Sequence, residues 1–216
     1  MAGIDIALDI ASTVSGVFPV LASLYNYRNF DNVLKIVAVF FLIESLFDPI
    51  MWMLPELWGV SNNMPLIHIN IIVTVLFFTV IYYRLFLKQI LKMVTIALSA
   101  ITLIITFYYN FNMLEYPSVS RTTEGIMMII LSLLYFYQLL NPEKFVDIEK
   151  QGLFWINAGV LIYFSVNMFL FMIFTRIPIA DRHNYYIINS VTNIIANILF
   201  SVGLLCKPQK TTLSRY

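Results

Sequence analysis

The chain has 216 residues, of which 60% are hydrophobic and 12% are charged, and its mean hydropathy is +0.83. Soluble domains contain about 45–50% apolar and about 25% charged residues, so this composition effectively excludes a water-soluble fold. The formal net charge of +1, without any long basic run, argues against nucleic acid as a partner. Cys206 is the only cysteine, which excludes an intrachain disulfide and a cysteine-based zinc site.

Seven apolar stretches predict an all-α bundle of seven transmembrane helices, with residues 1–216 forming a single domain in the lipid bilayer. A helix needs about 20 residues, each rising about 1.5 Å, to cross about 30 Å of hydrocarbon. In chain order the predicted spans are residues 5–24, 33–54, 64–87, 90–109, 124–140, 152–174 and 184–206. The third and fourth are divided at residues 88–92, because one continuous helix would place a cationic cluster in lipid. An alternative with six spans merges or drops the fourth.

Lysine and arginine are distributed unequally between alternate loops of the predicted bundle. Cytoplasmic loops of multi-pass membrane proteins carry an excess of these residues. Ten lie on one side, namely Arg28, Lys35, Arg84, Lys88, Lys92, Lys144, Lys150, Lys207, Lys210 and Arg215, and three on the other, namely Arg121, Arg176 and Arg182. This distribution predicts an N-terminus outside, a C-terminus in the cytoplasm, and a multi-pass protein of the cell inner (plasma) membrane.

An offset of 119 residues lays the first three predicted spans over the last three. Under this offset Asp48 meets Asn167, Asn70 meets Asn189, and Lys88 meets Lys207. Such matches favour an internal repeat of two three-helix units joined by the fourth helix, an arrangement with binding sites commonly at the repeat interface. The alternative is coincidence, because apolar helices of similar length align easily.

Polar side chains within the predicted spans are the candidates for a binding site. An ionisable residue in hydrocarbon costs several kcal/mol and therefore suggests a functional site. The depth of each residue, judged from the direction of its span, favours one pocket that opens to the outside and binds a small or lipid-derived ligand. The predicted ligand-binding residues are Glu44, Asp48, His68, Asn167, Asn189 and Asn193. Alternatively, these side chains form separate hydrogen bonds between helices, as the Asn189, Asn193 and Asn197 stripe would.

No catalytic or cofactor motif is recognisable in the sequence. The histidines, His68 and His183, lack the HExxH spacing or a similar metal-ligand spacing, and no glycine-rich phosphate loop or Ser–His–Asp set is present. We therefore expect no enzymatic activity, no cofactor and no metal.

One stretch of the predicted sixth span carries a resemblance to a known group of proteins. It reads Phe154-Trp155-Ile156-Asn157-Ala158-Gly159-Val160-Leu161-Ile162-Tyr163-Phe164, and Asn189 and the Asn193/Asn197 stripe follow it. In these features the chain resembles bacterial seven-transmembrane sensor-type membrane proteins, the stand-alone relatives of membrane regions that precede histidine kinases. The resemblance implies a sensor or accessory signalling protein that acts through a separate histidine kinase or another membrane partner.

The predicted topology is also similar to that of SWEET and PQ-loop carriers, which share the plan of three, one and three helices. Their Pro-Gln signature lies within helices, whereas Pro208-Gln209 lies in the C-terminal tail here. This similarity implies the alternative function, a carrier of small solutes such as sugars or amino acids that is proton-coupled through Glu44.

Overall fold

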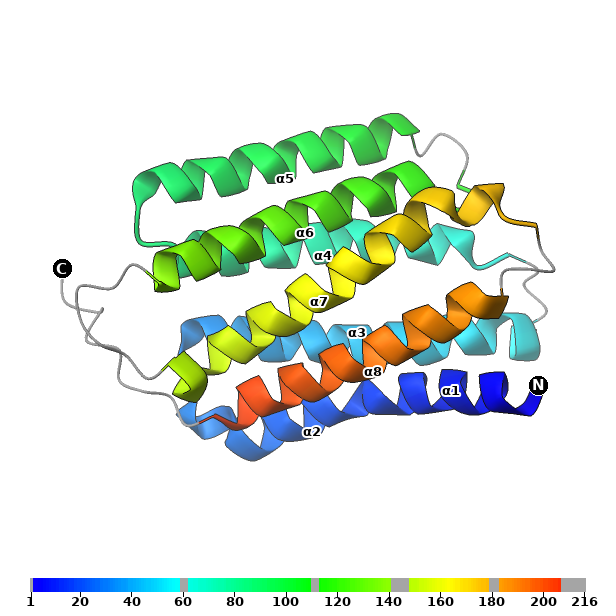
Figure 1. Ribbon diagram of the computed structural model, residues 1–216, viewed down its shortest axis with the longest axis horizontal. Coiled ribbons are helices and arrows are strands. Elements are labelled where there is room, and N and C mark those ends of the chain that lie inside the picture. The colour runs from blue at the N-terminus through cyan, green and yellow to red at the C-terminus, as the bar shows by residue number, and fades with distance from the viewer. Residues whose placement is uncertain (1, 59–61, 110–112, 141–147, 179–182, 207–216) are drawn as a thin grey trace.

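The computed structural model describes residues 2–58, 62–109, 113–140, 148–178 and 183–206, and in these residues the fold is all-helical (Figure 1). The α-helices are α1 (Ala2–Ser15), α2 (Val17–Asn26), α3 (Asn32–Trp58), α4 (Met64–Leu85), α5 (Gln89–Tyr109), α6 (Ser118–Leu139), α7 (Gly152–Ile173) and α8 (His183–Leu205). Single turns of 3-10 helix cover Tyr27–Asn29, Ile148–Lys150 and Phe174–Arg176. Helices satisfy their backbone hydrogen bonds internally, which is why apolar chains in lipid adopt them.

Six segments within the described residues are long and apolar enough to cross a membrane. They are Ala7–Asn29, Met64–Leu85, Gln89–Tyr109, Ser118–Leu139, Gly152–Arg176 and Tyr185–Leu205. The protein is therefore a multi-pass integral membrane protein. Because α4 ends at Leu85 and α5 begins at Gln89, the third and fourth predicted spans are separate helices and do not merge into one. Helix α3 has 27 residues but is not among the six segments.

The first membrane segment is interrupted where α1 meets α2. Pro19 has no backbone N–H to donate to the carbonyl of Ser15, and its ring crowds that carbonyl. The helix is interrupted at Gly16. The N–H of Gly16 donates to the carbonyl of Thr13, three residues earlier, at 3.2 Å. The single predicted span 5–24 is thus two helices joined at one residue.

Polar side chains close the ends of two helices. At the start of α3, Asp31 Oδ1 accepts hydrogen bonds from the N–H groups of Val33 (2.9 Å) and Leu34 (2.8 Å), as an N-terminal cap does. At the end of α8, Asn26 Nδ2 donates to the carbonyls of Leu204 (2.9 Å) and Cys206 (3.2 Å). The second contact fixes the end of α2 against the last turn of α8.

The helices pack in a continuous series across the bundle. Helix α8 packs against α1, α2 and α7, helix α7 against α6, and helix α6 against α4 and α5; α3 packs against α2 and α4. Helix α5 lies at one edge of the bundle and α1 with α2 at the other (Figure 1). The centre is apolar, and its most buried side chains are those of Ile71, Val75, Met128, Leu131 and Ala196.

Helix α5 shows how the bundle is adapted to lipid. Its buried face carries the small polar residues Thr95, Ser99, Thr102 and Thr106, whereas isoleucines such as Ile96 and Ile104 are exposed. Small residues let membrane helices approach closely, and exposed aliphatic side chains are compatible with acyl chains. The polarity of α5 is therefore the reverse of that of a helix on the surface of a soluble protein.

Candidate functional site

A cavity of about 450 Å³ lies among α3, α4, α6, α7 and α8. Its polar lining residues include Glu44, Asn70, Arg121, Glu124, Asn189, Asn193 and Asn197. Aromatic side chains line much of the remainder, including Phe40, Phe41, Phe78, Phe164 and Phe200. The cavity therefore has both polar and aromatic walls, within an apolar bundle.

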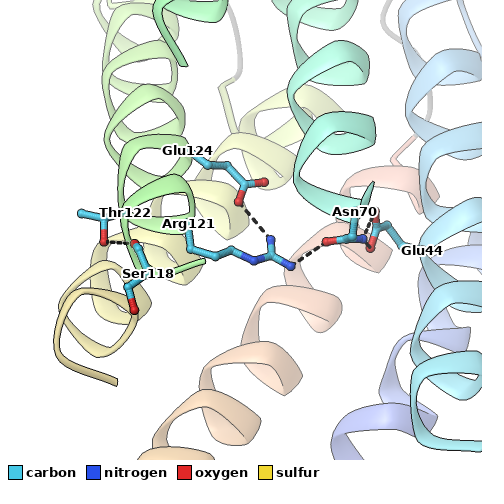
Figure 2. A network of polar contacts seen from close by, with 6 residues as sticks. All are labelled: Glu44, Asn70, Ser118, Arg121, Thr122 and Glu124. Atoms are coloured by element: carbon cyan, nitrogen blue, oxygen red, sulfur yellow. Dashed lines mark hydrogen bonds and ion pairs between the residues drawn. The ribbon is translucent and has the colours of Figure 1, made fainter. Parts of the chain in front are cut away.

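A chain of polar contacts crosses the cavity from α3 to α6 (Figure 2). The Asn70 amide on α4 donates from Nδ2 to both carboxylate oxygens of Glu44, at 2.9 and 2.8 Å. Its Oδ1 accepts a hydrogen bond from Arg121 Nη2 at 2.7 Å. Arg121 Nη1 in turn contacts Glu124 Oε2 at 2.9 Å. One asparagine thus connects a carboxylate on α3 to an ion pair on α6.

The Arg121–Glu124 ion pair is buried in the bundle. The exposed fractions of the two side chains are 15% and 0%. The guanidinium carbon also lies 5.9 Å from the centre of the Phe171 ring, a geometry that favours a cation–π contact. Glu124 Oε1 is buried and has no hydrogen-bond partner among the described residues. The two charges therefore neutralise each other, but one carboxylate oxygen of Glu124 accepts no hydrogen bond within the described part of the chain.

Tyr116, in the loop before α6, also lines the cavity and stays neutral. Burial raises the pKa of this phenol to about 12, although the positive charge of Arg121 acts in the opposite direction. A neutral phenol adds a polar group at the cavity wall without adding charge.

The asparagine stripe of α8 serves chiefly to join α8 to α1. Three hydrogen bonds follow one another along this contact: Ser190 Oγ to Asp9 Oδ1 (2.7 Å), Asn193 Nδ2 to Ser12 Oγ (2.9 Å) and Asn197 Nδ2 to Ser15 Oγ (2.9 Å). Asn189 differs, because its Oδ1 is buried and has no hydrogen-bond partner among the described residues. The structural interpretation of the stripe thus holds for Asn193 and Asn197, whereas Asn189 Oδ1 takes no part in these hydrogen bonds.

The six residues predicted to bind ligand do not all meet. Glu44, Asn189 and Asn193 line the cavity. His68 does not line it; the residue is buried, and its Nε2 lies 3.1 Å from the carbonyl oxygen of Glu115. Asn167 also lies apart, and its Nδ2 donates to the carbonyl of Tyr163 one turn earlier on α7, at 2.9 Å. The side chain of Asp48 lies outside the described residues.

Arg121, Glu124 and Asn70 were not among the predicted site residues. Arg121 was expected to lie in a loop, because the predicted span began at residue 124. Helix α6 begins at Ser118, in a polar run that apolar length alone does not detect. Two signals were present, namely Pro117 just before the helix and the spacing of Arg121 and Glu124, which places both on one helix face.

Comparison with known proteins adds no relative from which a role could be transferred. No protein-family model, no curated protein and no solved structure matches the chain.

Proposed function

We propose that this membrane protein is a receptor-like sensor or accessory signalling protein that binds a small or lipid-derived ligand in the cavity. The observation that carries the proposal is the series of polar contacts from Glu44 to Glu124 beside aromatic side chains, in a cavity of about 450 Å³. Ligand sites typically have volumes of about 300–1,000 Å³ and combine apolar walls with a few convergent polar groups.

Coupling between helices supports a signalling role. The polar chain joins α3, α4 and α6, so a ligand that rearranges one contact changes the interactions that position the other helices. A ligand shifts such an equilibrium only to the extent that it binds one arrangement better than the other. The resemblance to seven-transmembrane sensor proteins supports a readout by a separate histidine kinase or another membrane partner.

The proposed topology has seven crossings, with α3 as the crossing additional to the six apolar segments. The N-terminus lies outside and the C-terminus in the cytoplasm, in the inner (plasma) membrane. The excess of lysine and arginine in alternate loops supports this orientation. Helix α5 runs along the bundle, so the end of α4 and the start of α6 lie at opposite ends of it (Figure 1).

Single-cysteine labelling tests the orientation. In a Cys206→Ser background, Lys88→Cys is expected to react with a membrane-impermeant thiol reagent only after permeabilisation, whereas Met113→Cys reacts in intact cells. Both positions are exposed, and α5 lies between them. The reverse pattern would invert the topology, and labelling of both from the same side would show that α5 does not cross.

A panel of ligands tests the binding function. We expect at least one class among cationic, anionic and neutral amphipathic molecules to raise the unfolding temperature of the purified protein in lipid nanodiscs. A ligand at about 100 times its Kd stabilises the folded state by about 2.7 kcal/mol. The cavity-lining substitution Thr74→Trp should abolish the response, whereas Leu76→Trp, on the exposed face of the same helix, should preserve it. Absence of any stabilisation would refute the proposal.

A small-solute carrier is the second candidate. The supporting observation is the interruption at Gly16, because this residue lines the cavity and broken helices often form the substrate sites of transporters. In this alternative the two three-helix units related by the 119-residue offset would rock, with proton coupling through Glu44. Uptake into proteoliposomes that falls on Glu44→Gln would favour the carrier, and a panel without uptake would favour the sensor.

A further inference from the structure

We infer that the cavity selects a ligand with an ammonium group attached to an aromatic body. The inference rests on the proposed ligand-binding function and specifies the class of ligand. Two unused hydrogen-bond acceptors, Glu124 Oε1 and Asn189 Oδ1, carry it. Both residues line the cavity, and the Glu124 side chain is completely buried.

The unused groups require a donor. A buried acceptor that lacks a partner is costly, and more so when it belongs to a carboxylate. An ammonium group offers three N–H donors and no acceptor, so it can satisfy such oxygens without introducing a new unsatisfied acceptor. A carboxylate ligand, by contrast, would bring further acceptors towards them.

The charges of the cavity favour the same class. Among the described lining residues, Glu44 and Glu124 carry carboxylates and Arg121 carries the cationic group. Two donor groups of Arg121 are already engaged, by Glu124 and Asn70, and its guanidinium lies over the Phe171 ring. Apolar walls concentrate the field of such charges within a cleft, which raises the affinity for a cation.

The aromatic walls suit the body of the ligand. Phe174 and Tyr186 line the cavity and pack edge to face, with ring centres 6.0 Å apart, and aromatic faces attract organic cations. Farther along, the ring centres of Phe41 and Phe200 lie 4.7 Å apart. Phe200 follows Asn189 by 11 residues on α8, which places it about 16 Å farther along the helix axis. Aromatic side chains therefore line the cavity both near Asn189 and farther along α8.

Three indole derivatives test the selection by isothermal titration calorimetry on the full-length protein in lipid nanodiscs, with empty nanodiscs subtracted. Tryptamine carries an ammonium group, indole-3-propionate a carboxylate, and N,N,N-trimethyltryptammonium a positive charge without N–H donors on it. We expect tryptamine to bind about tenfold more tightly than either of the others, because only it supplies both charge and donors.

Variants assign the selection to the two acceptors. Glu124→Gln and Asn189→Leu should each weaken tryptamine binding by about tenfold. Asn189→Leu should leave indole-3-propionate unchanged, whereas Glu124→Gln should strengthen its binding, because the positive charge of Arg121 then lacks its carboxylate partner. Glu149→Gln, at an exposed position, is the matched control and should change neither. Asn189→Leu keeps the ion pair intact, so it tests the inference even if Glu124→Gln fails to fold.

The two proposals fail on different results. Equal affinities for tryptamine and indole-3-propionate, preference for the carboxylate, or absence of tryptamine binding would overturn the ammonium selection. In each of these cases the ligand-binding function stands if another class stabilises the wild-type protein but not Thr74→Trp. The ligand-binding function itself is refuted only if no class of ligand stabilises the wild-type protein without also stabilising Thr74→Trp.

Discussion

The Arg121→Met variant is expected to lose about 3–5 kcal/mol of unfolding free energy, the cost of removing one partner of a buried ion pair. The reason is that Glu124 has an exposed fraction of 0% and its charge would lose its closest cation. Asn70 Oδ1 would also lose its donor. The measurement is reversible unfolding in mixed micelles with increasing denaturing detergent.

Two controls separate the ion pair from a general effect of the substitution. Arg84→Met removes an exposed arginine near the end of α4 and should change the unfolding free energy by less than about 0.5 kcal/mol. The double variant Arg121→Met/Glu124→Leu should recover most of the loss, because replacing a buried pair with apolar residues is often nearly neutral. A loss below about 1 kcal/mol for Arg121→Met alone would show that solvent already screens the pair.

The Gly203→Ala variant is expected to be about 1–3 kcal/mol less stable than Gly125→Ala, because a close contact between α7 and α8 leaves no room for a methyl group. A Cβ atom on Gly203 would lie 2.5 Å from the carbonyl oxygen of Gly152 and 2.8 Å from Ile156 Cγ1. At Gly125 the nearest atoms would lie at 3.5 Å and beyond, which is ordinary contact. The comparison of two helical glycines cancels the gain in helix propensity, about 1 kcal/mol, that alanine brings to both.

Thermal unfolding in the same nanodiscs measures the difference between these variants. Contacts between small residues are a principal means by which membrane helices associate, since no hydrophobic effect drives them together in lipid. Equal stabilities of Gly203→Ala and Gly125→Ala would show that α7 and α8 are farther apart at this point than the structure places them.

Most helix boundaries can be predicted from the amino-acid sequence alone. The predicted spans 64–87, 90–109, 152–174 and 184–206 correspond closely to Met64–Leu85, Gln89–Tyr109, Gly152–Ile173 and His183–Leu205. The reason is that the length of an apolar run and the position of charges are properties of the chain, and lipid requires both to match its thickness. The start of α6 was wrong by six residues, because polar residues there are paired inside the bundle rather than placed in a loop.

Which polar groups come into contact depends on how the helices pack, and the amino-acid pattern does not show it. Glu44 stood out in the sequence as a charge within an apolar run, but its contact with Asn70, and the contact of Asn70 with Arg121, depend on the rotation of three helices about their axes. A helix that is apolar on all sides gives little indication of which face is buried. For the same reason His68 and Asn167, which the sequence grouped with Glu44, lie away from the cavity.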